Sequence, residues 1–599
     1  MLYFCNMNRL LYTVLLFAFF VQKLSAQADL STHFEKTNGN ETVTYTQGIE
    51  FLQMLADKFR CIQLFATGNT DAGIPLPYAV LSIDGDFDIA SLRKKNKTIV
   101  FINNNIHAGE PDGVDASLML FRDIARQTRQ EPAPPIVKAM QDMVLVMIPF
   151  YNVGGVQNRN STSRVNQNGP VAYGFRGNAQ NYDLNRDFIK QDTENARTFA
   201  QLFHAWKPEV YVENHTTNGA DYQHIITYLA TQPDKLGGKA GTYLRQKFIP
   251  DLEKRMQASK FPMSPYVTAF NETPDAGFYS FLDTPRYSSG YTSLFGTFSF
   301  IVESHMLKPF KQRVEGTYNF MQALILHTYE NGESIRNTVK MQQEAITNQQ
   351  DFPIKWLKDT IRKTKIDFLG YEATKKISKV TGLERLYYDR TKPYKKTISY
   401  YAFFNATTTV TKPLAYLIPQ GWQEVITRLQ RNGVKLHRLT SPQQVAVSAY
   451  YIADYETFTR PFEGHYLHTG VKITPENQTL AFQKGDYVVF TNQSSNRYII
   501  ETLEPQSPDS FFCWNFFDSI LQQKEYFSGY VFEDVAEKLL AENPTLKQQF
   551  EAKKQSDVTF AKDADKQLDF IYKQSVFYEK THLRYPVYRL EVKTDLPTE

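Results

Sequence analysis

The segment that most constrains the fold of this 599-residue chain is a short polar loop, residues 103–113, between an apolar run and a helical pattern. Residues 97–102, with the apolar stretch 99–102, indicate a buried strand, and residues 114–126 carry apolar side chains three positions apart, as in a helix. The loop between them contains His107 and Glu110. Because α/β folds place their chemistry on loops at the carboxyl ends of strands, we expect a functional site here.

His107 and Glu110 can direct an imidazole nitrogen and a carboxylate oxygen to one point, and zinc accepts both ligand types at about 2.0–2.2 Å. Two ligands do not make a site, and an exposed turn whose side chains face water has the same pattern. His215, at the end of the predicted strand 208–215, supplies a third candidate. Three protein ligands and one open position are what a catalytic zinc requires. The three residues therefore predict a site for one Zn²⁺ ion.

Strands and helices alternate on both sides of the loop. The patterns predict strands at 78–83, 97–102, 143–149, 208–215 and 297–305, and helices at 48–59, 114–126 and 194–206. Alternation of this kind is typical of an α/β domain. We expect a mixed, mostly parallel sheet flanked by helices on both faces.

Two further segments carry polar groups suited to a site. Residues 176–188 are rich in arginine and amide side chains, and a guanidinium group matches the geometry of a carboxylate. A solvated basic loop is the alternative interpretation of that segment. Glu303 lies near the end of the apolar run 297–305, where a carboxylate is costly to desolvate unless it has a partner or a task.

In their order along the chain, these segments resemble the signature of zinc metallocarboxypeptidases of the carboxypeptidase A type, over roughly residues 45–327. The matching positions are His107, Glu110, Arg176, Asn178, Asp183-Leu184-Asn185-Arg186, His215 and Glu303. The resemblance implies that His107, Glu110 and His215 hold the zinc ion. It also implies that Glu303 takes a proton from the attacking water as general base and returns it to the leaving amine as general acid.

The resemblance assigns the remaining polar residues to substrate recognition and support. Arg176 would stabilise the oxyanion that develops on the scissile carbonyl. Asn185 and Arg186 would bind the terminal carboxylate of the substrate, which restricts cleavage to chain ends. Asp183 would accept the second ring N–H of His107 and fix its tautomer.

This chain departs from the family pattern at several positions. Tyr287 is the nearest match to the tyrosine that closes over the substrate, but its interval to Glu303 is short and Tyr291 competes for the role. Asp187 stands where the family commonly has asparagine, which could alter how the carboxylate is held or admit an added cationic group. We expect His224 and His305 to be hydrogen-bonding neighbours of the site and not ligands.

Residues 1–26 differ from the rest of the chain. Arg9 precedes the apolar run 10–21, and Leu24-Ser25-Ala26 offers a small residue at a cleavage point, which predicts a secretory signal peptide. An uncleaved membrane anchor is the alternative. We expect a secreted or periplasmic protein that has no membrane contact after cleavage, with a catalytic domain at 27–345.

Residues 346–599 are expected to form a linker and a smaller α+β accessory domain. The sequence predicts a charged helical connector over 331–396, a strand-helix-strand unit over 415–436, and antiparallel strands at 466–473, 479–482 and 487–490. The aromatic run 511–517 is expected to pack against the neighbouring domain. This half has no metal-ligand spacing, so we expect a domain that props or narrows the site mouth. A separate binding module is the alternative.

Charge and cysteine content exclude several classes of function. Cleavage of the leader removes Arg9 and Lys23 and lowers the net charge from +4 to +2, so no nucleic-acid or other polyanionic partner is indicated. Cys61 and Cys513 lie far apart in sequence and are expected to be two buried free thiols without a disulfide framework.

Three functions remain compatible with the sequence. The first is a secreted zinc carboxypeptidase that acts on peptide or protein C-termini. The second keeps the zinc chemistry but acts on cell-wall peptides with D- or γ-linkages, where the change at Asp187 could matter. The third is a non-catalytic binding protein on a peptidase fold, which the intact set of polar residues disfavours.

Overall fold

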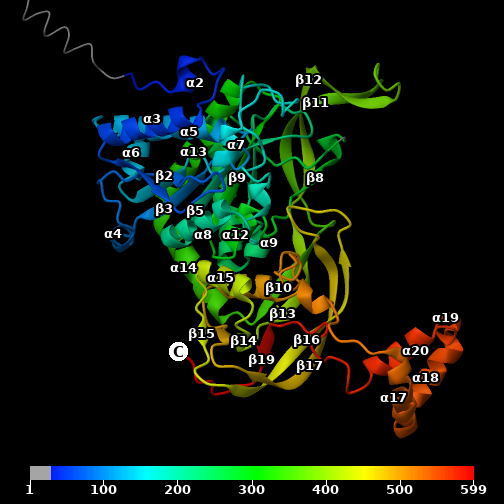
Figure 1. The fold of residues 1–599 in the computed structure, drawn as a ribbon. Helices are drawn as coiled ribbons and strands as arrows, with labels where there is room; N and C mark the ends of the chain where they lie inside the picture. Colours follow the sequence, from blue (N-terminus) through cyan, green and yellow to red (C-terminus); the bar gives the residue numbers. More distant parts are fainter. Residues whose placement is uncertain (1–28, 271) are drawn as a thin grey trace, which may run out of the picture.

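A computed structural model describes residues 29–270 and 272–599, so the predicted signal peptide lies outside the described residues. At its centre is an eight-stranded sheet with the order β1-β2-β4-β3-β5-β9-β6-β7 (Figure 1). The strands are β1 (Ile62–Thr67), β2 (Leu76–Leu81), β3 (Thr98–Asn103), β4 (Met143–Ile148), β5 (Val210–Thr217), β6 (Ile226–Ala230), β7 (Ser264–Pro265) and β9 (Phe298–His305). The central strands β4, β3, β5 and β9 run parallel, whereas β1, β2 and β6 pair in antiparallel fashion. This confirms the predicted mixed sheet.

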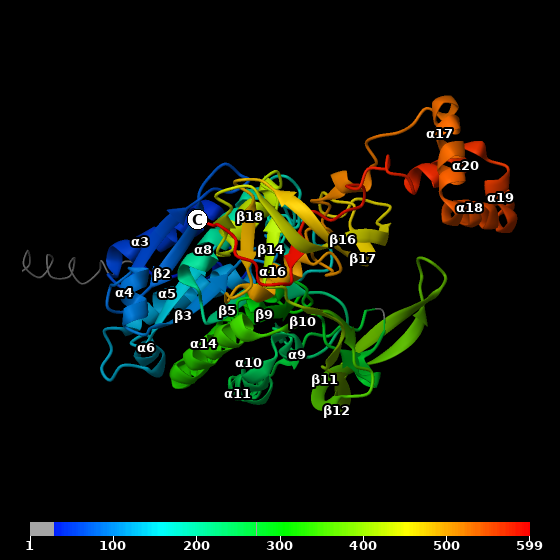
Figure 2. The same ribbon diagram turned by 90° about the horizontal axis from the view of Figure 1, so that it is seen from below.

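Helices cover both faces of the sheet because alternate residues of its strands point into two hydrophobic cores. On β3, Val100 and Ile102 face one core, while Ile99 and Phe101 face the other. The first core is closed by α3 (Tyr45–Lys58), α5 (Asp112–Gln127), α11 (Ile249–Ala258) and α13 (Phe310–Glu330). The second is closed by α8 (Glu194–Trp206) and α12 (Ser288–Ser293) (Figure 1), and Figure 2 shows the same layers from below. Helix α8 has the bounds that the sequence predicts.

The loop from β3 to α5 lies at the carboxyl edge of the parallel strands. The backbone N–H groups of Tyr151 and Asn152 donate to the carbonyl oxygens of Asn104 and Asn105 at 3.0 Å each, which fixes the loop against the end of β4. Helix α5 begins directly over β5. A Cβ atom at Gly113 would lie 2.3 Å from the Asn214 Cβ atom, so only glycine permits this close approach.

The connector after α13 differs from its prediction. It begins as helix α14 (Gly332–Asn348), as expected, but continues as β10 (Asp351–Lys358), β11 (Thr364–Ile377), β12 (Glu384–Tyr401) and β13 (Phe404–Thr411). Strands β11 and β12 form a long antiparallel ribbon whose base pairs with β8 (Phe278–Tyr279). The helical prediction failed beyond Asn348 because the charged residues there lie on solvent-exposed strands, where lysine also protects strand edges from association.

A second sheet, with the order β15-β18-β14-β19-β16-β17, forms the core of the C-terminal half. Its strands are β14 (Ala415–Ile418), β15 (His437–Arg438), β16 (Gln443–Thr457), β17 (His468–Phe482), β18 (Tyr487–Phe490) and β19 (Tyr588–Leu590), with helices α15 (Gln423–Arg431) and α16 (Asn496–Leu503) beside them. The predicted elements at 415–418, 422–431 and 487–490 are confirmed. The strand predicted at 434–436 lies instead at 437–438, and the two short strands predicted within 466–482 are one continuous strand.

The aromatic run 511–517 packs as predicted. Phe511, Phe512, Cys513 and Trp514 are buried in the same hydrophobic cluster as Phe199 of α8, so one continuous core joins the two halves. Cys61 and Cys513 are buried free thiols, as expected.

Helices α17 (Gly529–Glu542), α18 (Pro544–Ser556), α19 (Val558–Ala561) and α20 (Ala564–Lys573) form an appendage with a small core of its own, which stands away from the second sheet (Figure 1). Among the described residues, no helix has both the length and the apolar content of a bilayer span.

Candidate metal centre

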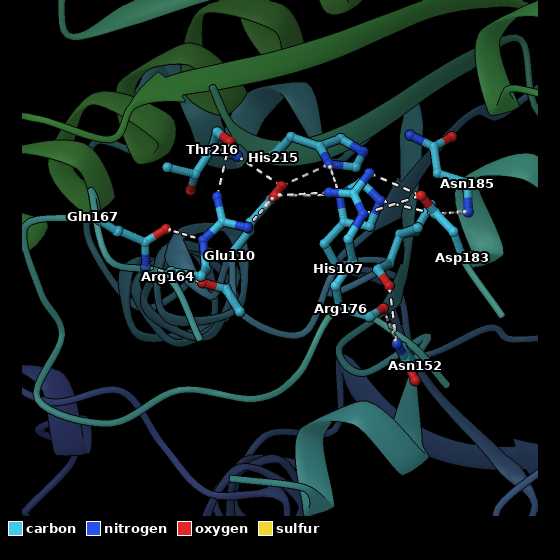
Figure 3. Close-up of polar contacts among 12 residues, drawn as sticks. His107, Glu110, Asn152, Arg164, Gln167, Arg176, Asp183, Asn185, His215 and Thr216 are labelled. Carbon is cyan, nitrogen blue, oxygen red and sulfur yellow. Dashed lines mark hydrogen bonds and ion pairs between the residues drawn. The ribbon is translucent and has the colours of Figure 1, made fainter. Parts of the chain in front are cut away.

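Three buried side chains, His107, Glu110 and His215, converge at the carboxyl edge of the central sheet (Figure 3). The Nδ1 atom of His107 lies 3.2 Å from Glu110 Oε1, and the Nδ1 atom of His215 lies 2.9 Å from Glu110 Oε2. The two Nδ1 atoms are 3.2 Å apart. In residues 29–270 and 272–599, this is the one cluster of three such side chains that could hold a metal ion.

The outer nitrogens of both rings indicate what the inner atoms bind. His107 Nε2 lies 3.0 Å from Asp183 Oδ1, and His215 Nε2 lies 2.7 Å from Glu213 Oε1. When each Nε2 carries the proton and donates it to its carboxylate, both Nδ1 atoms present lone pairs toward each other and toward Glu110. The Arg176 Nη1 atom lies 3.3 Å from His107 Nδ1, and a metal cation between the two rings would accept both lone pairs. Two imidazole nitrogens with one carboxylate oxygen suit zinc.

Neighbouring strands deliver the groups on either side of this cluster. His215 on β5 lies in register with Glu303 on β9. Glu213 precedes His215 by two positions, so both side chains lie on the same face of β5. Glu213 is fully buried and accepts hydrogen bonds from Ser288 Oγ and, at 3.3 Å, from Tyr211 Oη. The sequence analysis missed Glu213, although its spacing from His215 is a signal that could have found it.

Asp183 links the first histidine to an arginine. Besides contacting His107, its Oδ2 atom accepts from Arg176 Nη2 at 2.8 Å. Burial opposes ionisation of Asp183, but His107, Arg176 and Arg186 outweigh it and hold the pKa of this carboxyl well below its usual value. An ionised Asp183 accepts the Nε2–H of His107, and this leaves Nδ1 free for a metal.

Glu303 lines the same cavity beside the cluster. Burial raises the pKa of Glu303 to about 8; His215 lowers it, while the carboxylates of Glu110 and Glu213 raise it further. A cation held by the cluster would favour the ionised form through the same electrostatics. Glu303 therefore lies where its protonation state depends on the charge of the metal site.

The cavity has a volume of about 250 Å³ and combines cationic, amide and aromatic groups. The Arg186 guanidinium lies 4.6 Å from the centre of the Tyr287 ring. The Asn185 Oδ1 atom is buried and has no hydrogen-bond partner within the part of the chain that the structure describes. The rest of the wall includes Arg164, Arg176, Tyr266, Phe281, Leu229 and Ile301. The cavity therefore offers donors for an anionic group next to an apolar wall.

The structure separates the competing candidates of the sequence analysis. Tyr287 lines the cavity, whereas Tyr291 is buried in a hydrophobic cluster and donates to Asn432 Oδ1 at 2.5 Å. His224 contacts the Pro262 carbonyl oxygen at 2.8 Å, and His305 contacts Asp221 at 3.3 Å. Neither histidine belongs to the metal cluster.

Asp187 is also accounted for by its contacts. It is fully buried, pairs with Lys190 Nζ at 2.8 Å, and accepts from the backbone N–H of Thr193 at 2.9 Å. It thus anchors the start of α8 instead of lining the cavity.

Arg164 is a site residue that the sequence analysis missed. Its Nη1 atom donates to Glu110 Oε1 at 2.9 Å, and its Nε donates to Gln167 Oε1 at 2.6 Å. Burial opposes ionisation of Glu110, but His107 and Arg164 hold its pKa well below the usual range. Arg164 lies in a polar loop without periodicity, so no pattern in the sequence marks it.

The C-terminal half touches the site loop directly. Glu463 Oε2 accepts the backbone N–H of Asp183 at 2.8 Å. Two residues further on, His465 Nε2 lies 2.7 Å from Asp192 Oδ2, at the end of the same loop. These contacts connect the turn at 462–465 to the residues that orient His107.

Taken together, the ligand set, the adjacent carboxylate and the cation-lined cavity define a mononuclear metallohydrolase. Residues 49–230 match the model of the zinc carboxypeptidase family, and this segment contains all three cluster residues but ends before Glu303. The matched domain and the carboxypeptidase relatives support a zinc-dependent carboxypeptidase, an enzyme that hydrolyses peptide bonds.

Individual relatives are distant. Carboxypeptidase 2 of Trichophyton equinum is 22% identical over 462 residues, which cover 74% of this chain and 78% of the relative. Carboxypeptidase 2 of Trichophyton rubrum is 22% identical over 464 residues, with the same coverage. A solved metallo-carboxypeptidase from Pseudomonas aeruginosa, in complex with (2-guanidinoethylmercapto)succinic acid, has a TM-score of 0.37 and 11% identity; the match covers 49% of this chain and 70% of that one.

Proposed function

We propose that the protein is a secreted zinc carboxypeptidase that hydrolyses the terminal peptide bond of peptides or proteins. The observation that carries this proposal is the pair of imidazole Nδ1 atoms, 3.2 Å apart, that face one carboxylate at the wall of a cavity. The buried, unpaired amide oxygen of Asn185 and the guanidinium of Arg186 lie in the same cavity, where a terminal carboxylate and its amide would bind.

His107, Glu110 and His215 would hold the zinc ion. Bound there, zinc would act as a Lewis acid toward the scissile carbonyl and the attacking water. Asp183 and Glu213 keep the Nε2 protons of the two histidines and so present both Nδ1 atoms in the correct tautomer. Arg164 holds Glu110 ionised through the 2.9 Å contact with Oε1.

Glu303 would carry the proton during hydrolysis. Its carboxylate takes a proton from the water that attacks the scissile carbonyl and later donates it to the nitrogen of the leaving residue. Burial and the nearby carboxylates raise the pKa of Glu303, and a cation in the cluster would lower it again, so the bound metal would favour the ionised form that accepts the proton. Arg176, held by Asp183, would stabilise the developing oxyanion.

Recognition of the chain end would fall to Asn185, Arg186 and Tyr287. A guanidinium group can bind both oxygens of a carboxylate, and Asn185 can add an amide N–H. Tyr287 stacks on Arg186 and contacts Phe281 edge-on at 5.0 Å between ring centres, so it forms the wall beside this group. A free C-terminus is therefore the expected substrate feature.

Secretion and the domain limits complete the proposal. Residues 1–26 would be a signal peptide, which directs the protein to the periplasm or the exterior, and residues 27–345 would form the catalytic domain. Residues 346–599 would form a linker and an accessory domain. The end of α14 at Asn348 and the separate sheet that begins with β14 support that division.

The proposal is tested with matched peptides that differ only in a free or amidated C-terminus. We expect release of the last residue from the free peptide alone, and complete loss of turnover after chelation. Glu303→Gln should lower kcat by about 10²–10⁴-fold while zinc content stays at one ion per chain. Cleavage of the amidated peptide, or full activity of Glu303→Gln, would overturn the proposal.

Cell-wall peptides are a poorer candidate substrate. The sequence argument for them was the change at Asp187, and in the structure this residue pairs with Lys190 and Thr193. Faster release from murein stem peptides than from ordinary peptides would reverse this ranking.

A further inference from the structure

The ribbon formed by β11 and β12 reaches away from both sheets in each view (Figures 1 and 2). Its last ladder pair is Ile377 with Glu384, and the tip between them is a six-residue loop, 378–383. Three aliphatic side chains stand exposed at this tip: Ile377 is 67% exposed, Val380 is 94% exposed and Leu383 is 70% exposed. Aliphatic groups clustered at the end of a projecting ribbon have no packing role within the chain.

Cationic side chains surround these apolar groups. Residues 375–385 contain four of them, Lys375, Lys376, Lys379 and Arg385, and a single carboxylate, Glu384. Lys376 pairs across the ribbon with Arg385, so two cations share one face, and Lys376 Nζ lies 3.3 Å from the centre of the Tyr387 ring. The tip therefore combines an apolar end with a cationic collar.

The backbone of the tip satisfies much of its own hydrogen bonding. The N–H of Ser378 donates to the Leu383 carbonyl oxygen at 2.8 Å, and the N–H of Gly382 donates to the Ser378 carbonyl oxygen at 3.0 Å. Insertion of a loop into an apolar medium is costly when its backbone groups lose water without other partners. These two bonds lower that cost at the tip.

We propose that this tip docks on an anionic lipid surface. Val380 and its two aliphatic neighbours would enter the interfacial layer, and the four cations would lie among the anionic headgroups. Aliphatic insertion alone or a basic cluster alone binds a membrane weakly. The two together give reversible attachment to an anionic membrane. A zwitterionic lipid surface would accept the aliphatic side chains but would not attract the four cations.

The inference revises the sequence expectation of no membrane contact after cleavage of the leader. That expectation considered only the apolar leader as a membrane contact, whereas the ribbon tip concentrates cations beside exposed aliphatic groups. It is independent of the zinc chemistry, because it concerns a part of the molecule outside the cavity.

Vesicle flotation of the full mature chain tests the inference. We expect the protein to float with phosphatidylcholine vesicles that contain phosphatidylglycerol and to remain free with phosphatidylcholine alone. Val380→Asp should lower the bound fraction about tenfold, because it places a charge at the inserting point. Raising the salt from about 0.1 M to about 1 M should release the protein, since the Debye length falls from about 10 Å to about 3 Å.

Val592→Asp is the matched control, because Val592 is 69% exposed but lies near the C-terminus, outside the ribbon. It should float like the wild type, and both variants should keep wild-type hydrolysis of soluble peptides. Equal binding of Val380→Asp and wild type, or equal binding to both vesicle types, would overturn the proposal. So would a wild-type dimer that Val380→Asp dissociates while no vesicle binds, because the tip would then join two copies of the chain.

Discussion

The catalytic half and the C-terminal half both bury charged groups, and they differ in whether those groups satisfy one another. In the C-terminal half, Glu504 pairs with Arg589 and accepts from Tyr416 Oη at 2.5 Å. Arg589 also donates to the Thr411 carbonyl oxygen at 2.5 Å. Each charge in this cluster therefore has a complementary partner supplied by the chain.

In the catalytic half, the chain leaves polar atoms without such partners. The lone pairs of His107 and His215 face each other, and the buried Oδ1 atom of Asn185 has no partner within the described residues. Buried charge alone therefore does not identify a site in this molecule. What distinguishes the site is that two imidazole nitrogens and one carboxylate face a common point, where a bound cation would complete their coordination.

The largest expected effect tests this distinction at the metal cluster. His215→Ala removes one of three ligands, so we expect loss of bound zinc and a fall in kcat/KM of at least about a thousandfold. The fold should persist, because the substitution also removes the need for a cation between facing lone pairs. Metal analysis and circular dichroism of the purified variant check both statements. Wild-type zinc content in this variant would contradict the ligand assignment.

The C-terminal cluster should behave in the opposite way. Glu504→Ala removes the buried carboxylate that pairs with Arg589 and leaves this arginine only one carboxylate contact, that of its Nε with Glu591 at 2.8 Å, so the free energy of unfolding should fall by about 3 kcal/mol. Zinc content and kcat of the folded fraction should not change. Denaturant unfolding followed by a peptide assay separates the two effects. A lower zinc content with an unchanged free energy of unfolding would contradict the assignment of Glu504 to a purely structural cluster.

His224 offers a histidine for comparison with the two ligands. Its Nδ1 contacts the Pro262 carbonyl oxygen at 2.8 Å, and its Nε2 accepts the N–H of Leu369 at 3.1 Å, so the neutral ring is fully satisfied. Burial lowers the pKa of His224 to about 4. The unfolded state therefore binds this proton more readily, and the ring's contribution is present above about pH 6.5 and lost as the pH falls toward 4.

His224→Gln should accordingly reduce the loss of stability between pH 6.5 and pH 4 by up to about 3 kcal/mol. Unfolding of metal-free protein at several pH values measures the difference from wild type. An unchanged pH slope would mean that folding does not lower the pKa of His224.

The sequence predicts the parts of the site that lie at strand ends. His107, Glu110, His215 and Glu303 follow apolar runs, and the parallel ladder brings those ends together. Arg164 could not be predicted in this way, because an irregular loop carries it to Glu110. The residues of the ribbon were misassigned to a helix for a related reason.

On the ribbon, strand pairing over β11 and β12 involves residues 364–401, and both partners are charged and exposed along most of their length. Without a buried face, the period of two that marks a strand is weak. A single sequence thus predicts buried strands and the residues at their ends. It does not predict contacts between distant loops or the pairing of polar strands.

The smallest expected effect concerns the contact that the C-terminal half makes with the backbone of Asp183. Glu463 accepts a hydrogen bond from the backbone N–H of Asp183. The side chain of Asp183 orients His107, and the proposed carboxylate-binding pair, Asn185 and Arg186, follows it in the chain. Glu463→Ala leaves that N–H without its partner, a loss of about 1 kcal/mol, so kcat/KM should fall about fivefold, mainly through KM. Glu463→Gln keeps an acceptor oxygen and should retain nearly wild-type kinetics. If both variants lose activity equally, the charge of Glu463 and not its hydrogen bond supports the loop. If neither does, the C-terminal half packs beside the site without holding it.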